Sequence, residues 1–191
     1  FTAEEAISNM ELVASLRKPV GFFDPKNPAM KKAKDPTNEE EVKSIEEAST
    51  EGRSPMLSFS NTDMAFKDNI MVAGSYHGFN VYELADDGIP TLVSSVICPG
   101  GQGDVSIVEN LLIMSVQDTR GRLDCGLQGA GSEPSPERFR GIRIFDISDP
   151  TLPLQVGAVQ TCRGSHTHSV VSGPDANGKI INVQGEGVVG E

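Results

Sequence analysis

Two matching stretches decide the fold of this chain, DMAFKDNIMV at residues 63–72 and DVSIVENLLI at residues 104–113. Each reads as an aspartate, an alternating strand, a turn made of an acidic residue and asparagine, and an apolar strand. The second copy starts 41 positions after the first, from 63 to 104. Repetition near 40 residues with several strands per unit is typical of β-propellers. The sequence therefore predicts an all-β chain of propeller-like blades.

A second pair of stretches extends the repeat. GFNVYEL at residues 78–84 returns as GIRIFDI at residues 141–147, and each copy is followed by a proline-led turn and another strand. Here the spacing is 63 positions, from 78 to 141, which is 22 more than the 41 of the first pair. We therefore expect two complete blades, part of a third, and a surface loop inserted between Gln117 and Arg140.

Three regions follow from composition. Residues 1–21 read as an N-terminal docking segment with a helix from Thr2 to Leu16, because apolar residues recur there at helical spacing behind a Thr2–Glu5 capping box. Residues 22–55 are charged and contain prolines, as expected of an exposed linker, and residues 56–191 form the blades. Closed propellers need four or more blades, so we expect either a longer parent protein or completion by another chain.

The charge and hydropathy of the chain narrow the choice of partners. Its net charge of -11 argues against nucleic acid, whose binding requires dense Lys and Arg. No apolar run is long enough to span a membrane, so any membrane association would be peripheral, through a complex. The strand edges of an incomplete propeller need cover, which predicts other protein subunits as partners.

The three cysteines, Cys98, Cys125 and Cys162, are disulfide candidates. A pair of Cys125 with either of the others and a Cys98–Cys162 pair are equally compatible with the sequence. Buried reduced thiols are the alternative. A disulfide would place the protein in an oxidising compartment outside the cytoplasm.

One cluster could carry chemistry. When Cys98 is aligned with Cys162, Asp104 aligns with His168, and Asp63 holds the same position in the first blade. Inner strands of a propeller surround its central channel, so Asp63, Asp104 and His168 should converge near one mouth, with His166 beside them. These four residues are the candidate ligands of a divalent cation, although alternation along a strand would let only one histidine reach it.

The alternative for this cluster is structural. The carboxylates of Asp63 and Asp104, and likewise His168, would then cap turns or bond neighbouring backbone N–H groups. The cluster of Arg138, Arg140 and Arg143 near a strand start is interpreted as solvated side chains that pair with the acidic surplus.

At these residues the chain resembles the LVIVD-repeat family of bacterial exported β-propellers. The resemblance rests on IRIFDISDP at residues 142–150, and residues 121–126, 160–168 and 6–9 are similar to one long-chain branch of that family. The first blade departs from the pattern with Glu83 and a longer turn. The resemblance implies an N-terminal portion of a longer protein, a periplasmic or cell-surface location, and no established reaction.

Two functions are expected from these observations. The first is a non-catalytic binding or scaffold module, a peripheral subunit of a larger periplasmic or cell-surface assembly. The second is a metal-dependent hydrolase or oxidase with its site at the channel mouth. Stoichiometric metal that is lost on substitution of Asp104 or His168 would favour the enzyme.

Overall fold

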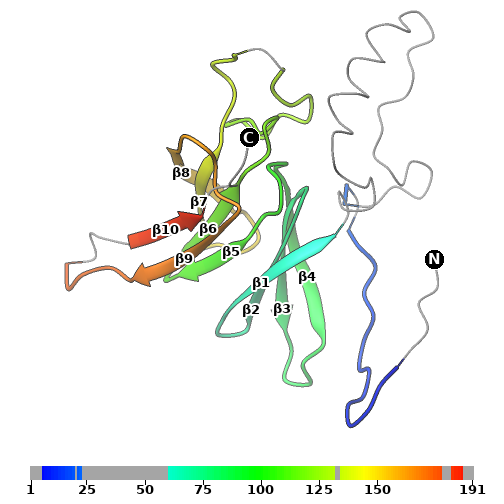
Figure 1. Cartoon of the computed structure of the whole chain (residues 1–191). Coiled ribbons are helices and arrows are strands. Elements are labelled where there is room, and N and C mark those ends of the chain that lie inside the picture. The colour runs from blue at the N-terminus through cyan, green and yellow to red at the C-terminus, as the bar shows by residue number, and fades with distance from the viewer. Residues whose placement is uncertain (1–5, 20, 23–59, 132–133, 178–181, 187–191) are drawn as a thin grey trace, which may run out of the picture.

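The computed structural model describes residues 6–19, 21–22, 60–131, 134–177 and 182–186, so the predicted linker lies almost wholly outside the described residues. The described part is all-β, as predicted, with two four-stranded antiparallel sheets and one two-stranded sheet (Figure 1). The first sheet holds β1 (Asn61–Lys67), β2 (Ile70–Ser75), β3 (Gly78–Leu84) and β4 (Pro90–Ile97). The second sheet holds β5 (Val105–Val108), β6 (Leu111–Val116), β7 (Gly141–Asp146) and β8 (Leu154–Gln160). The third, two-stranded sheet holds β9 (Thr167–Ser172) and β10 (Asn182–Glu186).

The repeated acidic-Asn turn connects the first two strands of each four-stranded sheet. Asp68 and Glu109 adopt positive φ angles of 51° and 52°, which suit a two-residue hairpin. The asparagine carbonyls of both turns accept a backbone N–H from the end of the third strand, Leu84 in one sheet and Ile147 in the other. The sequence repeat is therefore a repeat of hairpin geometry.

The core lies between the two four-stranded sheets. The Phe79 and Phe145 rings meet edge to face with centroids 4.9 Å apart, and Val72, Val81 and Leu112 are buried around them. β2 passes close to the loop before β5, because a Cβ at Gly74 would collide with the Gly103 carbonyl oxygen. Close approach of the backbones thus requires glycine at this position.

The helix predicted from Thr2 to Leu16 is not found in its described part, since residues 6–19 contain no helix. Asn9 has a positive φ of 57°, which interrupts a right-handed helix. The stripe formed by Ile7, Met10, Leu12, Val13 and Leu16 is exposed among the described residues, so it is not packed against the sheets. A short helix without tertiary packing is marginal in water, and this is the physical reason for the error.

The insertion lies between β6 and β7, as predicted, and the structure resolves the disulfide alternatives. Cys98 follows β4 and is bonded to Cys125 in the inserted loop, with their Cα atoms 4.4 Å apart. Cys162 is free and exposed. The disulfide therefore ties the loop of the second repeat to the end of the first sheet.

Candidate functional site

The candidate residues meet where the first strands of successive sheets lie side by side. β1 contacts β5, and β5 contacts β9 (Figure 1). At the second junction Asp104, just before β5, receives two contacts from His168 on β9. Its Oδ2 accepts the His168 backbone N–H at 2.8 Å and lies 2.9 Å from His168 Nδ1. The predicted approach of Asp104 and His168 is present.

Asp63 makes the corresponding contact at the first junction. Its Oδ2 accepts the Val105 backbone N–H at 3.1 Å. Each repeat thus places an aspartate on its first strand or just before it, and that carboxylate bonds the first strand of the next sheet. In the structure, the residue of the second repeat that corresponds to His168 is therefore Val105. The alignment of Cys98 with Cys162 had paired His168 with Asp104, which is one residue earlier.

The same one-residue difference holds for the cysteines. The Cys98 N–H donates to the His77 carbonyl and the Thr161 N–H donates to the Arg140 carbonyl, so Cys98 corresponds to Thr161. Cys162 lies one position further along the chain. This offset accounts for a buried, bonded Cys98 beside an exposed, free Cys162.

The environment of Asp104 favours its ionised form. Burial raises the pKa of the carboxyl, but hydrogen bonds from the ring and backbone N–H of His168, the His168 charge and a hydrogen bond with Asp63 outweigh it. The net pKa of Asp104 lies below its usual value. Asp63, Asp104 and His168 therefore form one connected polar cluster between β1, β5 and β9.

Ser115 on β6 completes this cluster, and the sequence analysis missed it. Its Oγ lies 2.8 Å from His168 Nδ1 and 2.9 Å from the hydroxyl of Ser165. Ser115 holds the repeat position of Gly74, 41 residues earlier, so a hydroxyl stands where the first junction needs a glycine. This substitution of serine for glycine between the two copies was the feature of the sequence that could have identified Ser115.

The two histidines have different partners. His166, before β9, bonds the Gln117 side chain through Nδ1, and His168 faces Asp104. The His168 Nε2 atom is buried and has no hydrogen-bond partner among the described residues. Within that part of the chain no three His, Cys, Asp or Glu side chains are arranged to hold a metal ion, and the divalent-cation site stays a prediction.

Arg143 on β7 is not solvated, and the interpretation made from sequence is wrong for this residue. It is fully buried, and its guanidinium donates to the carbonyls of Cys98 and Pro99, both at 3.2 Å, and of Arg122. Burial lowers the pKa of Arg143 to about 10, although Asp124 opposes this shift. Arg143 thereby joins the first sheet, the second sheet and the inserted loop.

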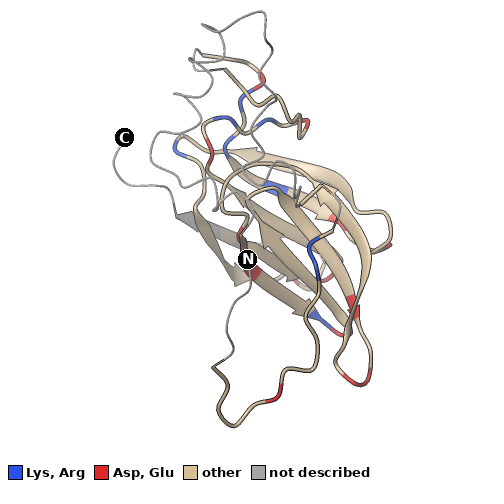
Figure 2. Ribbon diagram, turned by 90° about the vertical axis from the view of Figure 1, so that its right-hand side faces the viewer, with Lys and Arg blue, Asp and Glu red and all other residues tan. Residues whose placement is uncertain are grey.

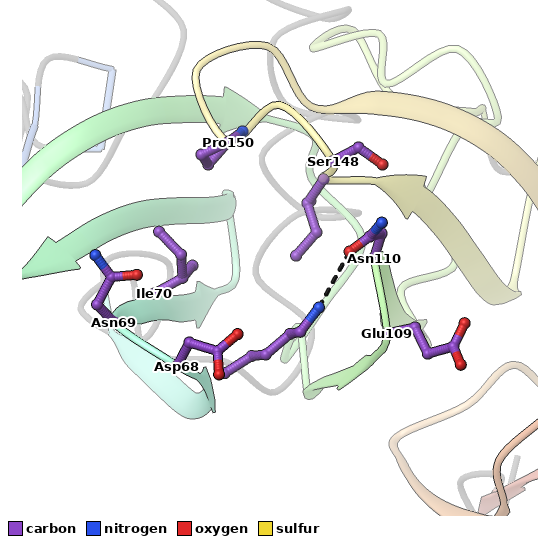
Figure 3. A pocket seen from close by; sticks show the side chains of 9 residues that line it. Asp68, Asn69, Ile70, Glu109, Asn110, Ser148 and Pro150 are labelled. Carbon is purple, nitrogen blue, oxygen red and sulfur yellow. Dashed lines mark hydrogen bonds between the residues drawn. The ribbon is translucent and has the colours of Figure 1, made fainter.

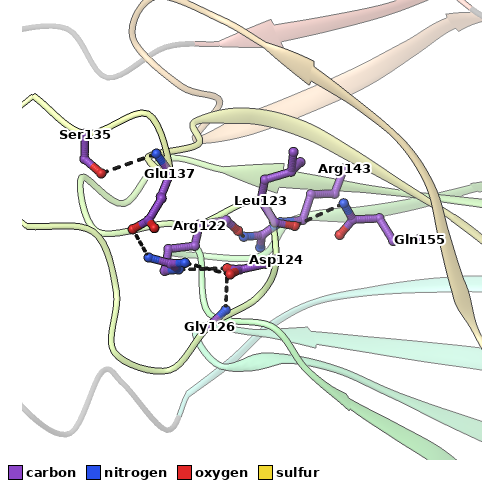
Figure 4. A network of polar contacts seen from close by, with 8 residues as sticks. All are labelled: Arg122, Leu123, Asp124, Gly126, Ser135, Glu137, Arg143 and Gln155. Atoms are coloured by element: carbon purple, nitrogen blue, oxygen red, sulfur yellow. Dashed lines mark hydrogen bonds and ion pairs between the residues drawn. The ribbon is translucent and has the colours of Figure 1, made fainter.

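The inserted loop has its own network of ion pairs around Arg122 (Figure 4). Arg122 pairs with Asp124 at 2.6 Å and with Glu137, and it makes an isolated β-bridge with Arg138. The hydrogen bond from Arg122 holds the pKa of Asp124 well below its usual range. These contacts, with the Cys98–Cys125 bond, fix the shape of a loop that has little regular structure.

A cleft of about 160 Å³ lies at the opposite, hairpin end of the two sheets (Figure 3). The Lys67 side chain extends across the cleft, and its ammonium group donates a hydrogen bond to Asn110 Oδ1 at 3.1 Å. Asp68 and Glu109 carry carboxylates at its rim. Basic positions (blue) and acidic positions (red) occur both near the inserted loop and at the hairpin end of the sheets (Figure 2).

No helix in the described ranges is both long and apolar enough to cross a membrane. This agrees with the absence of a membrane-spanning run in the sequence. Comparison of the chain with protein-family models, curated proteins and solved structures gave no match.

Proposed function

We propose that this chain forms successive blades of a β-propeller that acts as a non-catalytic binding or scaffold module in a larger assembly. Two features support the propeller architecture. Each four-stranded sheet is a simple meander of consecutive strands, and the first strands β1, β5 and β9 lie next to one another. Blades whose inner strands surround an axis have this arrangement.

The observation that carries the proposal is the exposure of repeat positions whose counterparts in the other copy pack against the core. Phe66 is 57% exposed on the face of the first sheet opposite Ala65, whereas its counterpart Ile107, 41 residues later, is partly buried against the core between the sheets. Val159 is likewise exposed, whereas its counterpart Val96, 63 residues earlier, packs against that core. The outward faces of the first and second sheets therefore carry apolar residues suited to packing against another sheet.

The proposed location is the periplasm or cell surface of a bacterium, and the proposed family is that of the LVIVD-repeat proteins. The Cys98–Cys125 disulfide is consistent with an oxidising compartment. The Asp-Pro turn after β7, in which the Asp149 side chain accepts the Thr151 N–H at 2.9 Å, fits the repeat pattern of that family. Other protein subunits are the proposed partners.

The test is a native mass measurement on protein purified under oxidising conditions, together with its metal content. The scaffold proposal expects this polypeptide to copurify with other polypeptides or to belong to a longer chain, without stoichiometric metal. A monomer of 20.3 kDa that binds no protein would contradict it. Stoichiometric metal that is lost in both Asp104→Ala and His168→Ala would favour the metal-dependent hydrolase or oxidase instead.

A further inference from the structure

The N-terminal residues 6–19, with Gly21 and Phe22, form a segment that we call the strap, and its last residues dock on the first sheet. Phe22 is only 2% exposed, and its ring meets the His77 ring edge-on with centroids 6.3 Å apart. Gly21, at φ 88°, passes so close to Ile97 that a Cβ there would collide with the isoleucine side chain. A buried aromatic ring and a close glycine contact make this a specific docking site.

His77 lies in the turn between β2 and β3, and its backbone is fixed. Its N–H donates to Ser75 Oγ at 3.2 Å, and its carbonyl accepts the Cys98 N–H at 2.8 Å. The strap therefore docks against an imidazole whose backbone position is held by the turn.

The charged surroundings of His77 oppose its protonation. The strap contributes the Lys18 ammonium, and the end of β4 contributes the uncharged Ile97 and the disulfide-bonded Cys98. Burial, followed by the Lys18 charge, lowers the pKa of His77, and burial also lowers the pKa of Lys18. Among the described residues, no carboxylate contributes to the pKa of His77.

We propose that the strap is released by acid, because protonation would place a second positive charge near Lys18 in the half-buried contact of His77 with Phe22. When the strap is undocked, His77 regains an ordinary pKa near 6.5. Docking therefore has its full strength above pH 6.5 and weakens as the pH falls from 6.5 toward the lowered pKa of the docked state. Histidine switches in other proteins use the same linkage.

Release would detach an already exposed apolar peptide from the first sheet. Ile7, Met10, Leu12 and Val13 lie exposed on the strap, and docking at Phe22 fixes where they are presented. In a protein outside the cytoplasm, the pH of the surroundings would then control how far this segment reaches. Acid release of the strap depends only on the contacts of Gly21 and Phe22 with the first sheet. It can therefore be disproved without affecting the proposed scaffold function, and the scaffold function can be disproved without affecting strap release.

The experiment is an NMR titration of the full chain from pH 8 to pH 4.5. It follows the imidazole protons of the three histidines, assigned with His77→Gln, together with the Phe22 ring and Ile97 methyl signals. We expect His77 to titrate below 6.5, and the Phe22 and Ile97 signals to lose their docked shifts along the same curve. Lys18→Gln should raise the pKa of His77, and the matched control Arg17→Gln should leave it unchanged.

Two results would overturn the proposal. One is Phe22 and Ile97 signals that stay constant through the titration of His77. The other is a pH-dependent loss of docking that persists in His77→Gln. The Phe79–Phe145 ring contact reports in every sample that the sheets remain folded, so a misfolded variant cannot be mistaken for strap release. Phe22→Ala supplies the undocked reference, in which His77 should titrate near 6.5.

Discussion

At the scale of single residues, Asp104 is a position where one substitution breaks two contacts between sheets. Asp104→Ala leaves both the backbone N–H and the Nδ1 atom of His168 without their carboxylate partner. We expect a loss of about 1–3 kcal/mol in the free energy of unfolding, measured by urea denaturation. Asp63→Ala removes one backbone contact, with Val105, together with its side-chain hydrogen bond to Asp104, and it should cost less; equal losses would contradict the special role of the second junction.

Asp104 also predicts a dependence of stability on pH. Its pKa is depressed in the folded state, so its contribution is present above the unfolded value of 3.8 and is lost as the pH falls through the lower folded pKa. The native protein should lose stability below about pH 4 more steeply than Asp104→Ala. Parallel curves of unfolding free energy against pH for the two proteins would show that Asp104 has no such linkage.

The role of Arg143 depends on the planar shape of its guanidinium as well as on its charge. Lysine keeps the positive charge but cannot match a planar guanidinium that reaches three carbonyl groups. Arg143→Lys should lower the free energy of unfolding by about 1–3 kcal/mol for the buried carbonyls it leaves unpaired. The exposed Arg163→Lys is the control, and a thermal scan that cannot distinguish the two variants would argue against this role.

At the scale of elements, the inserted loop should depend on the Cys98–Cys125 bond. The bond closes a segment with a sequence separation of 27, for which chain entropy gives a stabilisation of about 3.5 kcal/mol. Reduction should therefore lower the midpoint of thermal unfolding, and Cys162→Ser should not. Thiol titration in denaturant should find one free thiol before reduction and three afterwards; three before reduction would exclude the bond.

The strands were predictable from sequence, but the ends of the chain and the buried polar groups were not. Alternation and the acidic-Asn turns located the strands because hairpin register is a local property. The apolar stripe in the N-terminal segment led to the incorrect prediction of a helix, because helical spacing does not show whether the apolar side chains have a surface to pack against. Asp104 and His168 were found through the repeat, whereas Ser115 and Arg143 depend on contacts between sheets that local patterns do not encode.

At the scale of the whole molecule, the two outward sheet faces should control association. Phe66 is exposed but holds the repeat position of Ile107, and Val159 holds that of Val96, so both resemble core residues without a partner sheet. A lysine there would place a charge in any sheet-on-sheet contact, at a desolvation cost that only association would incur. Phe66→Lys should therefore fold normally and bind its partner subunits poorly.

The matched comparison is its neighbour Ala65, which points into the core between the two sheets and is 9% exposed. Ala65→Lys buries an unpaired charge in the folded chain itself and should unfold the first sheet. Circular dichroism separates loss of folding from loss of association, and light scattering measures the association. Unchanged association of Phe66→Lys, with its fold intact, would mean that the outward face of the first sheet is free of partners in the assembly. The search for its binding surface would then move to the inserted loop and the hairpin cleft.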